Sequence, residues 1–127
     1  MVPKYILDSS YLIALYLQED VNHTRALEIF KIIKNSELYI HTHVIAEVVT
    51  ILTYRMGQNL SFKFLVETQS SSNIHLLESN ISEQIEDFKI LNKKISFTDS
   101  VILAIAKRSK YDLVTFDKQM LTILNKK

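Results

Sequence analysis

Short apolar runs alternate with longer amphipathic stretches along the whole chain. The short runs predict buried strands over residues 5–7, 38–40, 74–77 and 113–116, because polar residues bound each of them. In the longer stretches, apolar residues recur at helical spacing. The pattern predicts helices over 9–17, 23–35, 42–56, 61–69, 82–94 and 96–109, followed by a short final helix. Within 82–94, we expect Ile85, Phe88 and Leu91 to face inward.

Strands that alternate with helices indicate a parallel sheet covered by helices on both faces. We therefore predict an α/β fold with three layers, α/β/α, built on a central parallel sheet of four or five strands. The 127 residues are expected to form a single domain, 1–127, with one hydrophobic core. Ligands of such sheets bind at the carboxyl ends of the strands.

Composition narrows the class of protein. The chain has no cysteine, which excludes disulfides and thiolate metal sites. No apolar run approaches the roughly 20 residues of a membrane span, and no signal-peptide pattern precedes the first strand. We expect a cytoplasmic protein with no membrane partner. From Lys89 onward there are nine Lys/Arg and three Asp/Glu. This basic region could attract phosphate or simply provide solvated helix ends.

Four carboxylates occupy positions that are costly unless a partner neutralises them. Asp8 follows the first predicted strand, Asp117 follows the fourth, and Asp99 lies in the first turn of a buried helix. Glu47 lies inside a helix with apolar residues on both sides, which is difficult to explain as a solvent-facing position. Clustered oxygen ligands without thiolates suit Mg²⁺ or Mn²⁺. Such ions can activate water and stabilise a phosphodiester transition state.

Each acid also has a purely structural explanation. Asp8 and Asp117 could cap the helices that follow them, and Asp99 could be favoured by the helix dipole. Glu47 could pair with Arg55 or another cation. His43 could also be a metal ligand, but imidazole suits Zn²⁺ better than Mg²⁺. The alternative is that His41 and His43 lie at the start of a helix near the site without binding metal. Periodicity alone cannot bring the four acids together.

The order of these motifs resembles the PIN domains and, within them, the VapC-type toxin ribonucleases. YILDSSYLIALY resembles the first strand of the family and its first acid, and QEDVNHTRALEIF resembles the second helix. HTHVIAEVVTIL resembles the helix that carries the family's glutamate. SFTDSVILAIAKRSKYDLVTFDKQM is similar to the C-terminal block, where TD opens a buried helix and T-x-D follows the next strand. PIN domains usually close with one more strand, whereas this chain ends in MLTILNKK.

The resemblance implies a Mg²⁺- or Mn²⁺-dependent endoribonuclease that cleaves single-stranded or structured RNA, as the toxin of a toxin–antitoxin pair. Asp8 and Asp99 would be the principal metal ligands and Glu47 would complete the acidic cluster. Asp117 would act through water or a second ion. The supporting hydroxyls would be those of Ser9 and Thr115. A cognate antitoxin and homodimerisation are also implied.

Other functions fit the sequence less well. A haloacid-dehalogenase-type phosphatase needs D-x-D after the first strand, whereas Asp8 is followed by Ser9 and Ser10. A receiver domain needs an acceptor aspartate at the end of a middle strand, and neither 38–40 nor 74–77 ends in one. A PIN-like RNA- or protein-binding module without catalytic activity stays open as the alternative, because an intact acidic cluster does not prove turnover.

Overall fold

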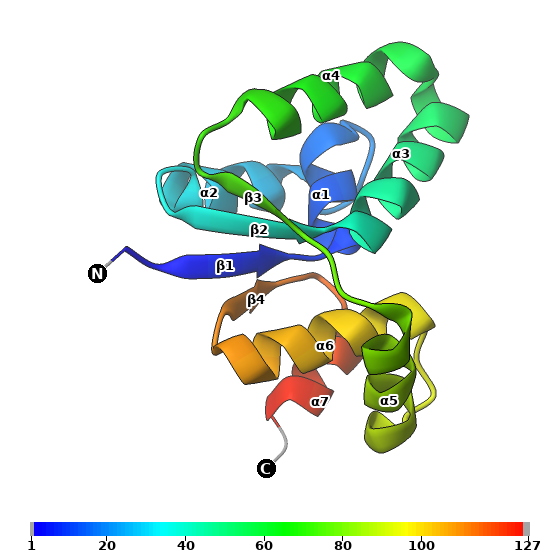
Figure 1. The fold of residues 1–127 in the computed structure, drawn as a ribbon. Helices are drawn as coiled ribbons and strands as arrows, with labels where there is room; N and C mark the ends of the chain where they lie inside the picture. Colours follow the sequence, from blue (N-terminus) through cyan, green and yellow to red (C-terminus); the bar gives the residue numbers. More distant parts are fainter. Residues whose placement is uncertain (1, 126–127) are drawn as a thin grey trace.

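A computed structural model describes residues 2–125 of the chain. The elements follow in the order β1 (Lys4–Leu7), α1 (Ser9–Tyr16), α2 (His23–Ile33), β2 (Glu37–His41), α3 (Thr42–Met56), α4 (Gln58–Ser70), β3 (Ile74–Leu77), α5 (Ile81–Leu91), α6 (Phe97–Ser109), β4 (Asp112–Val114) and α7 (Lys118–Asn125). The four strands are parallel and lie in the order β3–β2–β1–β4. Helices α1–α4 cover one face of the sheet and α5–α7 the other (Figure 1). The predicted three-layer α/β/α fold is confirmed, with four strands in the described part of the chain.

The centre of the sheet is apolar because helices cover it on both sides. Ile6 of β1 is fully buried and lies in register with Tyr39 of β2 and Leu113 of β4. On α6, the consecutive residues Val101–Leu103 are also fully buried. A strand in the interior of a parallel sheet ends in the middle of the carboxyl edge, where ligands of such folds bind. This topology places Asp8, which follows β1, at that position.

Helix α5 differs from the expected burial pattern. Ile85 and Phe88 were expected inside, but they are 45% and 39% exposed, whereas Gln84 is only 3% exposed. Leu91 is partly buried, as expected. The helix carries apolar residues around much of its circumference, so periodicity did not identify the face that packs. That face was selected by polar partners on β2, α3 and the β3–α5 connection.

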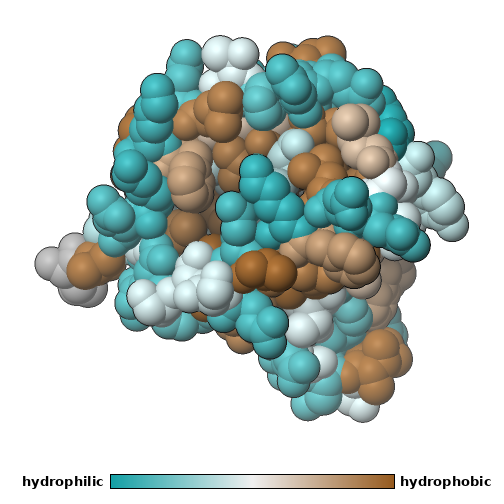
Figure 2. Space-filling model, turned by 90° about the horizontal axis from the view of Figure 1, so that it is seen from above, coloured by the Kyte–Doolittle hydropathy of each residue, from teal (hydrophilic) through white to brown (hydrophobic). Residues whose placement is uncertain are grey.

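A cavity of about 600 Å³ lies between α1, α2 and α4. Its lining is mostly apolar, with Leu12, Leu27 and Phe64 contributing, and Lys63 and Glu67 add charge. Figure 2, which looks onto the layer of α1–α4, shows hydrophobic surface between hydrophilic side chains on this face. None of the four acids lines this cavity. Separately, none of the helices in residues 2–125 has the length and hydrophobicity needed to cross a bilayer.

Candidate active site

Asp8 occupies the centre of the carboxyl edge and is almost completely buried, with 2% of its surface exposed. It caps α1, and its Oδ2 accepts hydrogen bonds from the hydroxyls of Ser10 (2.8 Å) and Thr115 (2.7 Å). Its second oxygen, Oδ1, is buried and has no hydrogen-bond partner within residues 2–125. A buried carboxylate oxygen that lacks a partner is costly. A cation beside Oδ1 would remove that cost.

The loop between β4 and α7 is tied to Asp8 through the same hydroxyls. The backbone N–H of Phe116 donates to Ser10 Oγ (2.9 Å), and that of Asp117 donates to Thr115 Oγ1 (3.0 Å). Asp117 Oδ1 in turn accepts from the backbone N–H groups at the start of α7, at 2.9 and 3.1 Å. Asp117 is therefore a helix cap, as one of the sequence interpretations anticipated, and it lies two residues from a direct partner of Asp8.

Asp99 lies in the first turn of α6 and is partly buried. Ser96 caps this helix by accepting the backbone N–H of Asp99 at 3.0 Å. Burial is the main cause that raises the pKa of the Asp99 carboxyl to about 6, and the negative charge of Asp8 adds to it. Smaller upward contributions come from Asp117 and Glu47, against a lowering hydrogen bond from Ser96. The negative charges of the other three acids therefore all raise the pKa of Asp99.

Glu47 differs from its expected environment. It lies on α3, which begins at a cap formed by His41: His41 Nδ1 accepts the backbone N–H of His43 at 3.0 Å. The Glu47 residue is exposed, not enclosed by its apolar neighbours. Successive residues on a helix point in different directions, so the adjacent Val48 is buried while Glu47 is not. The suggested pairing with Arg55 is also not formed, because Arg55 pairs with Glu19 at 2.7 Å.

The chemistry of this donor set fits a hard divalent cation, since all four side chains offer carboxylate oxygens. As they stand, however, no three His, Cys, Asp or Glu side chains in residues 2–125 are close enough together to hold one metal ion. The more exposed acids would have to turn toward Asp8 to share an ion. Asp8 itself is held in one orientation through its Oδ2, and its Oδ1 stays free to bind a cation.

The raised pKa of Asp99 predicts a specific pH dependence of stability. Its pKa in the folded protein, about 6, lies above the ordinary value of 3.8. The folded state therefore binds more protons between those values, and its stability falls as pH rises through that window. In metal-free protein at neutral pH, we expect Asp99→Asn to raise the free energy of unfolding by about 1–2 kcal/mol, after allowing for solvent screening. Urea unfolding of both proteins should show this gain shrinking below about pH 4. A gain of equal size at both pH values would contradict the assignment.

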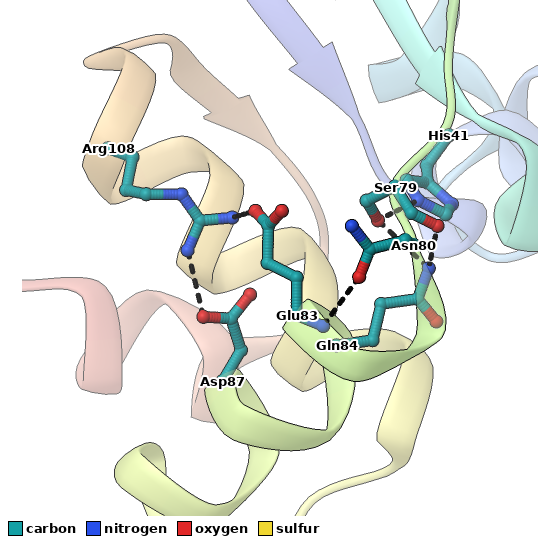
Figure 3. Close-up of polar contacts among 7 residues, drawn as sticks. All are labelled: His41, Ser79, Asn80, Glu83, Gln84, Asp87 and Arg108. Carbon is teal, nitrogen blue, oxygen red and sulfur yellow. Dashed lines mark hydrogen bonds and ion pairs between the residues drawn. The ribbon is translucent and has the colours of Figure 1, made fainter.

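A polar network joins His41, at the end of β2, to Ser79 and to Gln84 of α5 (Figure 3). His41 is fully buried, and burial lowers its pKa to about 4, so it is neutral at physiological pH. Because its Nδ1 accepts a hydrogen bond, its Nε2–H donates to Ser79 Oγ at 3.0 Å. Gln84 donates to Ser79 O (2.7 Å) and Ser79 Oγ (2.9 Å), and its Oε1 lies 2.8 Å from His43 Nε2. Both ends of the Gln84 amide are thus satisfied.

Ion pairs with α6 hold another side of α5. The guanidinium of Arg108 on α6 donates to Glu83 (2.9 Å) and Asp87 (2.8 Å) of α5 (Figure 3). These groups are partly solvated, so the ion pairs contribute modestly to stability. Helix α5 therefore connects the helix that carries Glu47 with the helix that carries Asp99.

Substituting Gln84 should show how much the network stabilises the fold. We expect Gln84→Leu to lower the free energy of unfolding by about 1–3 kcal/mol, because it removes the hydrogen-bond partner of His43 Nε2 and of the Ser79 carbonyl oxygen. Urea unfolding followed by circular dichroism measures the loss. Glu86→Leu, an exposed position of the same helix, is the matched control and should change stability little. Equal losses in both variants would count against the network.

Other predicted site residues occupy mixed positions. The hydroxyl of Thr115 donates to Asp8 Oδ2 at 2.7 Å. Among the described residues, the side-chain hydroxyl that reaches Asp8 from α1 is that of Ser10, not that of the expected Ser9. Sequence reasoning missed Ser10 and Gln84. The two consecutive serines after Asp8 were a signal that could have identified Ser10, but nothing in the sequence indicated Gln84.

The comparisons with known proteins agree with this fold. A family model described as PIN domain matches residues 5–123. VapC20 from Mycobacterium tuberculosis, a sarcin-ricin loop cleaving toxin, has a similar structure, with a TM-score of 0.80 and 17% identity over 93% of both chains. PAE2754 from Pyrobaculum aerophilum has a TM-score of 0.68 and 22% identity, over 97% of this chain and 86% of that one. FitAcB from Neisseria gonorrhoeae has a TM-score of 0.63 and 15% identity, over 95% and 93%. A comparison with curated proteins found no match.

Proposed function

Because the chain belongs to the PIN-domain family, we propose that it is a metal-dependent endoribonuclease and the toxin of a toxin–antitoxin pair. The observation that carries the proposal is the buried Asp8, whose Oδ1 has no hydrogen-bond partner within residues 2–125. Asp8, Asp117 and Glu47 all raise the pKa of Asp99, which supports a common site for the four acids. Neighbouring carboxylates repel one another, and a cation that they share would offset that repulsion. A divalent cation, Mg²⁺ or Mn²⁺, fits that role.

Each acid has a role in this proposal. Asp8 and Asp99 are the principal ligands, Glu47 orients a water molecule, and Asp117 completes the acidic edge. When bound, the cation supplies an activated water and stabilises charge on the phosphodiester. Thr115 and Ser10 hold the Asp8 carboxylate in one orientation through its Oδ2. Asp99, whose pKa is raised to about 6, gives up any proton it holds when it becomes a ligand.

The proposed substrate is single-stranded or structured RNA. Support comes from VapC20, which is described as a sarcin-ricin loop cleaving toxin and has a similar fold. The basic region from Lys89 onward also supports a polyanionic substrate. A cytoplasmic location is part of the proposal, because cellular RNA is the proposed substrate.

The proposal includes a cognate antitoxin and a homodimer. The cavity between α1, α2 and α4 supports a protein partner, because it combines apolar lining with exposed Leu27 and Phe30 at 42% and 37%. We assign this cavity to the antitoxin. Co-expression with the product of the adjacent gene, followed by size-exclusion chromatography with light scattering, tests both the complex and the dimer.

The second candidate is a PIN-like RNA- or protein-binding module without catalytic activity. It is favoured by one observation: no three potential ligand side chains in the described structure are placed to share an ion as they stand. A binding module should gain little stability from Mg²⁺ or Mn²⁺, whereas a nuclease should gain stability that rises with the logarithm of the ion concentration above its dissociation constant.

Cleavage of RNA by the purified protein tests the proposal directly. We expect a mixed single-stranded RNA to be cut with Mn²⁺ or Mg²⁺ and to stay intact with EDTA. Asp99→Asn should abolish cleavage, because a neutral amide cannot replace a carboxylate ligand. Metal-dependent stabilisation without cleavage would indicate a narrower target or a retained antitoxin. Neither cleavage nor metal-dependent stabilisation would favour the inert module.

A further inference from the structure

Arg25 has a role that neither the sequence motifs nor the acidic cluster assigned to it. We infer that its guanidinium binds a phosphate of the RNA strand next to the bond that is cleaved. The inference deepens the proposed ribonuclease function and rests on it. Its starting point is the contact between Arg25 and the loop that follows β4.

Arg25 lies in the first turn of α2 and is exposed. Its Cζ is 5.2 Å from the centroid of the Phe116 ring, within the range of a cation–π contact. The ring of Tyr11, which is fully buried, lies 6.2 Å from that of Phe116. Phe116 is therefore packed against a rigid core residue and offers Arg25 a fixed surface.

Phe116 also ties Arg25 to the acidic cluster. Its backbone N–H donates to Ser10 Oγ at 2.9 Å, and Ser10 Oγ donates to Asp8 Oδ2 at 2.8 Å. Its neighbours in the chain are Thr115, which bonds Asp8, and Asp117. The guanidinium thus rests on the residue that connects Asp8 with the α7 end of the site.

Arg25 differs from the other two arginines of the chain in having no carboxylate partner within residues 2–125. Arg55 pairs with Glu19 at 2.7 Å, and Arg108 pairs with Glu83 and Asp87. A cation–π contact does not use up the N–H donors of a guanidinium as a carboxylate partner would. Its N–H donors lie in the plane and stay available for bidentate binding of a phosphate.

The negative charge of the site favours a cation at this position. Asp8, Asp99, Asp117 and Glu47 together repel a phosphodiester strand, and metal binding offsets only the charge at the reacting centre. A fixed positive group beside the cluster attracts the adjoining phosphate and aligns the strand. Arg25 is held in that place by Phe116 before RNA arrives, so binding costs less side-chain entropy.

Binding of a short fluorescein-labelled single-stranded RNA of mixed sequence tests this role. The measurement is fluorescence anisotropy with Ca²⁺ present to neutralise the acids, with the RNA checked on a gel for integrity. We expect Arg25→Ala to weaken binding about tenfold and to reduce the slope of log K against log salt concentration by about one. Arg25→Lys keeps the charge but loses the planar guanidinium over Phe116. It should therefore have the salt slope of the wild type but only part of its affinity for RNA.

Lys31→Ala is the matched control, because Lys31 is an exposed cation in the last turn of the same helix. It should change the affinity less than about twofold, as expected for a distant charge screened by salt. Equal effects of Arg25→Ala and Lys31→Ala, with wild-type protein binding RNA, would overturn the inference alone. If Arg25→Lys binds RNA as tightly as the wild type, the contact between the guanidinium and Phe116 has no role in binding. If wild-type protein neither binds nor cleaves RNA, the proposed function fails as well.

Discussion

Asp8→Asn is expected to lower the rate of RNA cleavage by on the order of a thousandfold. The asparagine oxygen can still accept the hydroxyls of Ser10 and Thr115, so the fold around α1 should be retained. The amide NH₂ would stand where the unpartnered Oδ1 is now. A neutral donor group in that place cannot bind a cation.

The same substitution separates a catalytic defect from a folding defect. In the absence of metal, Asp8→Asn should be at least as stable as the wild type, because a buried charge has been removed. The wild type should gain stability with rising Mn²⁺, by about 2.7 kcal/mol at a hundred times the dissociation constant, and the variant should gain little. Thermal unfolding across a Mn²⁺ titration measures both properties. Asp112→Asn, at an exposed acid on β4, is the control. A wild-type response to Mn²⁺ in Asp8→Asn would remove Asp8 from the metal site.

Phe64→Ala is expected to lower the free energy of unfolding by about 3–5 kcal/mol. Phe64 is fully buried on α4 and meets the ring of Tyr16 edge to face, with centroids 5.2 Å apart. Its ring also lines the cavity between α1, α2 and α4. Removing it enlarges that cavity and loses the contacts that hold α4 against α1.

A neighbouring phenylalanine provides the control for this prediction. Phe62 lies on the same helix but is 59% exposed, so Phe62→Ala should change stability by less than about 0.5 kcal/mol. Urea unfolding of the two variants measures the difference, and thermal unfolding should show a decrease of about 10–20 °C in Tm for Phe64→Ala only. Similar losses in both variants would mean that α4 does not pack as described.

The alternation of apolar runs determined most of the fold. Each predicted strand and helix is present, with ends that differ by a few residues, because burial patterns along one element are local properties. The position of Asp8 directly after β1, where it caps the following helix, also followed from the sequence, since capping depends on neighbouring residues. The family followed from the order of four such motifs and was confirmed by the match over 5–123.

Tertiary structure decided what local patterns could not. The order β3–β2–β1–β4 brought Thr115 to Asp8 across 107 positions of sequence, and crossover connections set that order, not propensity. The rotation of each helix about its axis decided that Ser10 reaches Asp8, that Glu47 is exposed and that Gln84 is buried instead of Ile85 and Phe88. It likewise paired Arg55 with Glu19 and left Arg25 on Phe116. Sequence periodicity gives the composition of a helix surface, but only the partners packed against it determine which side becomes buried.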